Sequence, residues 1–91
     1  MTTFLKDPEA VLDYSIDWTD FLESAETIFS SQWFYPTGIT LDSNGHTDKV
    51  ATAWLSGGTV GQSYELVNRI TTDNDPARVD ERTIIISIVN K

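Results

Sequence analysis

Three segments in the second half of the chain constrain the fold more than any other feature. They are Val50 to Leu55, Ser63 to Thr72 and Arg82 to Val89, separated by turn residues at Ser56-Gly57-Gly58 and at Asp73-Asn74-Asp75-Pro76. Segments rich in β-branched and aromatic residues and bounded by Gly, Asn, Asp and Pro predict strands joined by short connections. This half of the chain therefore specifies a scaffold of paired strands and supplies few residues for chemistry.

The first half continues the pattern. From Val11 to Trp18, apolar and polar residues alternate, which predicts a half-buried strand with an acidic outer face. The acidic stretch that begins at Thr19 predicts a loop or a single helical turn. Strands are then expected over Thr27 to Phe34 and around Ile39 to Leu41, followed by a tight hairpin at Asn44-Gly45. Six or seven short strands at a spacing of about ten residues predict an all-β, two-sheet antiparallel sandwich.

Composition excludes several functions. The 91 residues predict a single domain over 1–91, and the formal net charge of −8 opposes binding to a nucleic-acid backbone. The chain has no run of about 18 apolar residues and no secretory signal pattern, so we expect no membrane partner and synthesis in a cytoplasm. It contains no Cys, a single His and no Gly-rich phosphate loop. We therefore expect a protein that works by binding.

Candidate chemical sites are few. Asp13, Asp17 and Asp20, or Asp73 with Asp75, can offer oxygen ligands to Ca²⁺, but neither group matches an EF-hand loop and both fit solvated surface residues equally well. His46 has no candidate nucleophile beside it in the sequence. We accordingly predict no catalytic residue, no metal ligand and no cofactor.

The aromatic residues divide into two groups. Trp18 and Trp54 each continue an alternating apolar face, which predicts that both lie in the core. The adjacent Trp33, Phe34 and Tyr35 cannot all point inward from one strand, so at least one of them meets solvent or a partner, and Phe34 or Tyr35 is the expected contact.

Both ends of the chain carry apolar residues that need cover. Phe4 and Leu5 form either an N-terminal arm, over residues 1–8, that packs on a neighbouring molecule or a strand that pairs within its own domain. The segment Thr83 to Val89 is apolar on both faces and has no internal charge, so it is either a central strand or an edge that a neighbouring subunit covers. The predicted partner interface comprises Phe4, Leu5, Trp33, Phe34 and Tyr35.

Six short blocks, in order, resemble a family of small tailed-bacteriophage structural proteins. The family is encoded among head and head-tail connector genes, and its members are often labelled phage fibre proteins. The resemblance implies an immunoglobulin-like sandwich, a place in the virion, several copies per particle and no catalytic residues. The blocks are Phe4-Leu5-Lys6-Asp7-Pro8, Leu12-Asp13-Tyr14 with Asp17-Trp18, Trp54-Leu55-Ser56-Gly57-Gly58, Gly61 with Ser63-Tyr64, Asn68-Arg69-Ile70-Thr71-Thr72 and Asp80-Glu81-Arg82.

Taken together, these features predict a non-enzymatic structural component of a tailed-phage virion that docks in multiple copies at the neck or head-tail connector. Its partners are then other virion proteins, contacted through the aromatic cluster and the N-terminal arm, and a basic patch on the partner steers docking of the acidic chain. One alternative is a capsid decoration protein. Another, of a different class, is a carbohydrate- or cell-surface-binding module carried by the particle.

Overall fold

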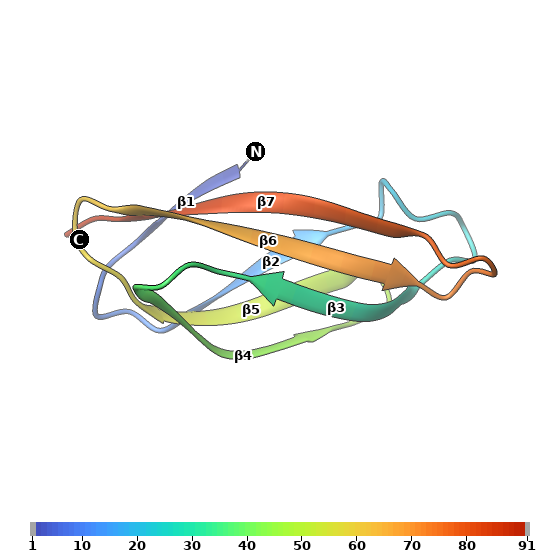
Figure 1. Ribbon diagram of the computed structural model, residues 1–91, viewed down its shortest axis with the longest axis horizontal. Coiled ribbons are helices and arrows are strands. Elements are labelled where there is room, and N and C mark those ends of the chain that lie inside the picture. The colour runs from blue at the N-terminus through green and yellow to red at the C-terminus, as the bar shows by residue number, and fades with distance from the viewer. Residues whose placement is uncertain (1, 91) are drawn as a thin grey trace.

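Seven strands in two sheets make up the protein. The computed structural model describes residues 2–90, so Met1 and Lys91, the limits of the predicted domain, lie outside the described residues. The strands are β1 (Thr2–Lys6), β2 (Leu12–Asp17), β3 (Ile28–Phe34), β4 (Ile39–His46), β5 (Val50–Gly57), β6 (Ser63–Thr72) and β7 (Val79–Ile88). They form an elongated body of 44 × 21 × 18 Å, shown in Figure 1 with its long axis horizontal.

The two sheets pack face to face with distinct strand orders. One sheet has the order β1-β7-β6-β3 and the other β2-β5-β4. The all-β sandwich prediction is confirmed. Lettered A to G in chain order, the sheets contain B-E-D and G-F-C, the strand orders of the immunoglobulin sandwich, although A pairs with G rather than with B. The immunoglobulin-like class stays a prediction, which this strand order supports.

The N-terminal segment is a strand of the domain. Thr2 to Lys6 pairs in parallel with Ile84 to Ile88 of β7, whereas the other strand pairs are antiparallel. Of the two alternatives for Phe4 and Leu5, the structure therefore shows pairing within the domain. The same pairing places β7 between β1 and β6. Of the two alternatives for the C-terminal segment, the structure therefore shows the central strand.

Alternation along the strands builds the core. Every second residue of β6 from Tyr64 to Thr72 is buried, and so is every second residue of β7 from Ile84 to Ile88. Burying one such Ile or Leu side chain contributes about 1.5–3 kcal/mol. The buried apolar residues form one cluster between the sheets, consisting of Tyr14, Ile16, Trp18, Leu22, Ile28, Trp33, Ile39, Ala51, Ala53, Leu55, Tyr64, Leu66, Ile70, Ile84, Ile86 and Ile88.

The hairpin predicted at Asn44-Gly45 is wrong. Both residues lie within β4, opposite Ala53 and Thr52 of β5, and the chain reverses only after His46. The turn is made instead by Thr47, whose amide donates to the Val50 carbonyl at 2.8 Å and whose hydroxyl accepts from the Val50 amide at 3.2 Å. A hydroxyl that bonds to nearby backbone amides competes with an Asn-Gly turn for the reversal point.

No helix is present among residues 2–90, and that range accordingly contains no helical segment able to cross a bilayer. The stretch after Trp18 is a loop with hydrogen-bonded turns, in which the amides of Phe21 and Leu22 both donate to the Trp18 carbonyl. The stretch is thus a loop that begins with a single helical turn, so it combines the two alternatives predicted for it.

Candidate docking surfaces

Three connections and the last residues of β7 meet at one end of the sandwich, on the left in Figure 1. We call it the Tyr35 end; it comprises the β1–β2 connection (7–11), the β3–β4 turn (35–38), the β5–β6 turn (58–62) and the end of β7. Backbone hydrogen bonds join these segments, from Val89 N to Lys6 O at 2.9 Å and from Gly61 N to Ile88 O at 3.0 Å. Segments far apart in sequence are thereby held as one surface.

A buried cation fastens the N-terminal strand to this end. Lys6 has no exposed surface, and its Nζ donates to the carbonyls of Asp7 at 2.9 Å and Gly57 at 2.8 Å. Burial lowers the pKa of the Lys6 ammonium, while the nearby carboxylates of Asp7, Asp42 and Glu9 act in the opposite direction. Because a buried ammonium is costly without partners, these carbonyls hold β1 against the end of β5.

The β5–β6 turn has little room to change shape. Gly58 has φ of +99°, and a Cβ there would lie 2.5 Å from Cδ1 of Ile88. Gly38 has φ of +108°, and its Cβ would lie 2.9 Å from the Tyr64 ring. The Tyr64 hydroxyl in turn accepts a hydrogen bond from the Thr59 amide at 3.1 Å. Backbone therefore packs directly on side chains, which preorganises the surface above it.

Large apolar side chains are exposed at the Tyr35 end. Leu5 is 56% exposed, Tyr35 47% and Val60 51%, and Val11 is exposed beside them in the β1–β2 connection. Leu5 lies on β1 and Tyr35 follows β3, the two outer strands of the four-stranded sheet, so these side chains offer separate apolar contacts around this end of the domain. Sequence reasoning did not single out Val11 or Val60 as contacts: Val11 was included in a predicted strand, which begins only at Leu12, and Val60 lies in a predicted turn.

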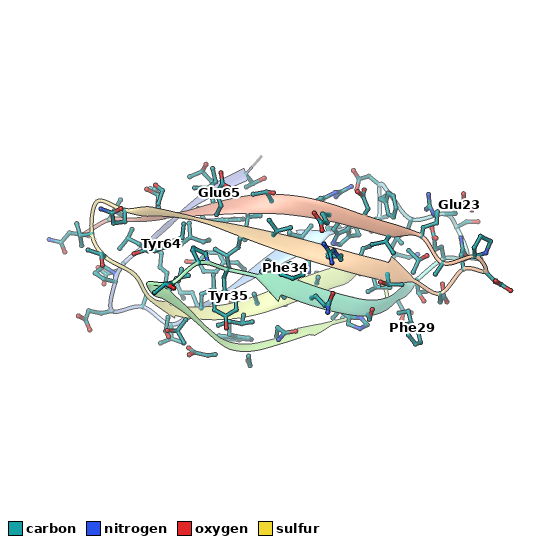
Figure 2. The ribbon with its side chains drawn as sticks, in the orientation of Figure 1. Glu23, Phe29, Phe34, Tyr35, Tyr64 and Glu65 are labelled. Atoms are coloured by element: carbon teal, nitrogen blue, oxygen red, sulfur yellow. The ribbon has the colours of Figure 1, made fainter. Side chains whose placement is uncertain are left out.

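The five predicted interface residues fall in four environments. Leu5 and Tyr35 belong to the exposed surface of the Tyr35 end, while Trp33 is buried in the core. Phe4 is half-buried and its ring packs on Tyr14 at a centroid distance of 5.2 Å. Phe34 is exposed on the outer face of the four-stranded sheet, with the Arg69 guanidinium 4.8 Å above its ring; Figure 2 labels Phe34 and Tyr35. Their joint role in docking stays a prediction, and the structure does not bring all five together.

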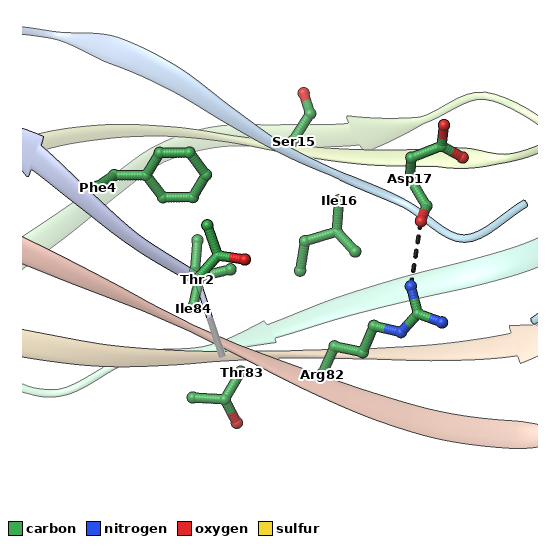
Figure 3. A pocket seen from close by; sticks show the side chains of 8 residues that line it. All are labelled: Thr2, Phe4, Ser15, Ile16, Asp17, Arg82, Thr83 and Ile84. Carbon is green, nitrogen blue, oxygen red and sulfur yellow. Dashed lines mark hydrogen bonds between the residues drawn. The ribbon is translucent and has the colours of Figure 1, made fainter. Parts of the chain in front are cut away.

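A groove opens along the seam between the sheets, beyond the first residue of β1. It encloses about 580 Å³ and is lined by Thr2, Phe4, Ser15, Ile16, Asp17, Arg82, Thr83 and Ile84, as Figure 3 shows. Arg82 reaches across the seam, donating to the Asp17 carbonyl at 3.1 Å and to the Asp20 carboxylate at 2.8 Å. Its guanidinium also lies 4.3 Å from the Trp18 ring centroid, so this side chain joins the two sheets.

The opposite end, which we call the Glu26 end, is built on an ion pair. The Glu26 side chain is fully buried, and its Oε2 accepts from Nε of Arg78 at 2.9 Å, while Oε1 contacts Nη2 of the same guanidinium. Hydrogen bonding to Arg78 lowers the pKa of Glu26 to about 2, against the opposing effect of burial. Arg78 also donates to the Phe21 carbonyl at 3.0 Å and stacks on that ring at 4.3 Å. The pair ties the β2–β3 loop to the β6–β7 loop.

Three of the five carboxylates considered as calcium ligands form hydrogen bonds or ion pairs with other side chains. Asp17 accepts from the amide and hydroxyl of Thr19, and Asp20 pairs with Arg82. Asp73 accepts from the amide and hydroxyl of Thr27, and these bonds lower the pKa of its carboxyl. Within the described range 2–90, no three His, Asp or Glu side chains converge on a point where an ion could sit.

The prediction that Trp54 lies in the core is wrong. It lies on β5 with its side chain 43% exposed, whereas its neighbours Ala53 and Leu55 face inward with no exposed surface. The two faces of β5 are both partly apolar, so alternation alone does not choose between them. The core already contains Trp18 and Trp33, and it accepts the small alanines of β5 rather than a third indole.

The fold defines the protein as a small all-β sandwich, and a family model makes the class specific. Residues 6–87 match the model of the family described as "Podophage GP4 fiber-tail adaptor protein gp77". The chain belongs to this family and is a structural protein of a tailed phage, part of the virion. A search of curated proteins finds no match to the chain.

Proposed function

We propose that the protein is a non-enzymatic adaptor that joins a tail fibre to the tail of a podophage, docking in multiple copies at the neck or tail. The observation that carries the proposal is the family match over residues 6–87, whose printed description is that of a fibre-tail adaptor. An adaptor must hold two partners at once, and an elongated sandwich with two differently built ends suits this task.

The Tyr35 end is the surface proposed for one partner. Its exposed Leu5, Tyr35, Val11 and Val60 supply apolar contact area, and Tyr is among the residues that most often dominate binding energy. The bonds of Lys6 and the tight packing around Gly58 order this surface before binding. A preorganised surface loses less conformational entropy on association, so more of the contact energy appears as affinity.

Charge is proposed to guide the encounter. With 14 acidic against 6 basic residues, the chain carries a field that attracts a basic partner surface from a distance and accelerates association. Rising ionic strength should therefore lower the association rate much more than the dissociation rate. An association rate that does not change with salt would contradict this part of the proposal.

The test is incorporation into particles. A phage lacking the gene would be complemented with Tyr35→Ser and Leu5→Ser variants, and the protein in purified particles counted by quantitative mass spectrometry against the major capsid protein. We expect particles of the parent to hold a ring-like number of copies, about six or twelve. Both variants should bind at least tenfold less, because each removes apolar contact area at a preorganised interface.

Phe29→Ser provides the matched control. Phe29 is 72% exposed but lies at the start of β3, next to the loop of the Glu26 end, as Figure 2 shows. This variant should be incorporated like the parent if the Tyr35 end makes the contact under study. If Phe29→Ser is not incorporated into particles and Tyr35→Ser is, the interface lies at the Glu26 end instead. Absence of the parent from particles would overturn the adaptor proposal, and hundreds of copies would favour capsid decoration.

A further inference from the structure

A second hollow lies on the outer face of the three-stranded sheet, around the exposed Trp54. It encloses about 300 Å³, at the lower end of the range of about 300–1,000 Å³ for small-molecule sites. It contains none of the residues of the Tyr35 end or of the seam groove. Its lining consists of Ser43, Asn44, Gly45, His46, Thr47, Thr52 and Trp54.

A β-bulge in β4 shapes this hollow. The register shifts between Leu41 and Ser43, so that Ser43 lies opposite Trp54 and Gly45 opposite Thr52. Residues directly opposite each other in an antiparallel pair share a face of the sheet. Without the extra residue, Asp42 and Asn44 would take these outward positions. The bulge therefore places the Ser43 hydroxyl opposite the indole and a glycine opposite Thr52.

Gly45 leaves the floor of the hollow open. A Cβ built on Gly45 would meet no atom within 4 Å, so the space above it is free. On the other side of Thr52, Ser15 of β2 completes the row, and the hydroxyls of Ser15 and Thr52 are 2.8 Å apart. The indole of Trp54 thus lies beside a row of small residues, Ser15, Thr52 and Gly45, on three adjacent strands.

The chemistry of the lining selects the ligand. Trp54 is the one large apolar group that lines the hollow, and the remaining groups are hydroxyls, an amide, an imidazole and backbone. A protein hot spot packs into a desolvated pocket with further apolar groups around it, which this lining does not supply. A phosphate or sulfate group needs cationic donors, and the lining contains no Lys or Arg.

A neutral sugar ring has the complementary properties. One of its faces is flat and apolar enough to stack on an indole, while hydroxyls around its rim donate and accept hydrogen bonds. We propose that the Trp54 hollow binds a neutral saccharide, stacked on Trp54 and hydrogen-bonded by the hydroxyls of Ser43 and Thr52, which share the outer face with the indole. The site goes beyond the adaptor role, because it gives the particle a contact with glycan on a surface separate from the docking end.

The scaffold supports a site at this position. Trp54 is on the central strand of its sheet, paired with Asp13 of β2 on one side and Ser43 of β4 on the other. At the bulge, the Asp42 carboxylate accepts a hydrogen bond from the Ser56 hydroxyl at 3.0 Å. A platform on a doubly paired strand is positioned more precisely than one on a loop.

The test is NMR titration of the full chain with neutral oligosaccharides built from glucose, galactose, mannose and N-acetylglucosamine. We expect at least one of them to shift the Trp54 indole N–H and the amides of Ser43 to Thr47, saturably and in the millimolar range or tighter. Trp54→Ala should weaken that binding at least tenfold. Gly45→Leu, which fills the floor and leaves the indole in place, should do the same.

Control variants separate this site from the docking surface. Phe29→Ser, a change at another exposed aromatic, and Tyr35→Ser should leave saccharide binding unchanged. Trp54→Ala should leave incorporation into particles unchanged, so that either proposal can fail without the other. Absence of saturable shifts for every sugar would overturn the saccharide site. Loss of particle incorporation in Trp54→Ala without sugar binding would instead assign the hollow to a protein partner.

Discussion

Replacing Asn68 by Leu should destabilise the protein strongly, because Asn68 is the polar centre of the core. The side chain is fully buried on β6. Its Oδ1 accepts from the Trp18 indole at 2.9 Å, and its Nδ2 donates to the Ser31 hydroxyl at 2.9 Å and to the Gln32 carbonyl at 3.0 Å. These three bonds connect β6 to β3 and to Trp18, the residue that follows β2.

The magnitude follows from these bonds. A neutral hydrogen bond contributes about 0.5–1.5 kcal/mol net, so three contribute roughly 1.5–4.5 kcal/mol. The Ser31 hydroxyl is near the surface and can bond to water, which reduces its share. The Trp18 indole N–H is buried, and leaving it without an acceptor costs about 1–3 kcal/mol. Leu has the branched shape of Asn but a larger volume, so no cavity forms, and any overpacking in the core adds to the loss. We expect Asn68→Leu to lower the free energy of unfolding by about 3 kcal/mol.

Urea unfolding followed by tryptophan fluorescence measures this loss, and a double-mutant cycle with Trp18→Phe isolates the bond between the two side chains. The coupling energy should be about 1 kcal/mol, within the range for contacting pairs. Asn44→Leu is the matched control, since Asn44 is exposed on β4 and the same change there should alter stability by no more than about 0.5 kcal/mol. The reasoning is refuted if Asn68→Leu is as stable as the parent, or if the two single losses simply add.

Further predictions concern single sites. Because the folded-state pKa of Glu26 is about 2, below the ordinary value of 4.5, its stabilising effect is present above pH 4.5 and lost as the pH falls toward 2. Urea midpoints should decline over that window, and Glu26→Gln should be less stable at neutral pH and lose this part of the decline. The Tyr14 hydroxyl is buried without a hydrogen-bond partner among residues 2–90, so Tyr14→Phe should raise the free energy of unfolding, by up to about 1 kcal/mol in the same urea assay. Gly58→Ala should lower the melting temperature measured by circular dichroism, because the positive φ costs about 1–3 kcal/mol and the new methyl group meets Ile88. An unchanged melting temperature would contradict the packing described for that turn.

The strand pattern was readable from the sequence where one face of a strand is clearly apolar. Tyr14, Ile16 and Trp18 alternate with Asp13, Ser15 and Asp17, so this strand and its buried face were predicted correctly. In such a segment the period of two and the burial agree, and no other element competes for the residues. The last strand was predicted as well, but with Ile85 between Ile84 and Ile86 both of its faces are apolar, and alternation did not identify the buried one.

The prediction failed where a tertiary contact decides between two local solutions. Asn44-Gly45 has the sequence of a tight hairpin, but the bulge at Asp42 and the hydroxyl of Thr47 carry the strand three residues further. Trp54 has the hydrophobicity of a core residue, but the other tryptophans already occupy the core. Lys6 was read as part of an arm, since no local pattern reveals that distant carbonyls will bury its ammonium.

The contacts of the Lys and Arg side chains explain how a small domain can be stabilised internally and still carry a strong negative charge. Every cationic side chain among residues 2–90 is engaged within the domain, either with backbone carbonyls or in an ion pair with Asp20, Glu26 or Glu81. These side chains are Lys6, Lys49, Arg69, Arg78 and Arg82. The basic side chains thus join strands and loops within the domain, and the remaining carboxylates face solvent. Acidic copies of the chain would repel one another, so under the proposed docking in several copies attachment would depend on the partner's surface rather than on contacts between copies.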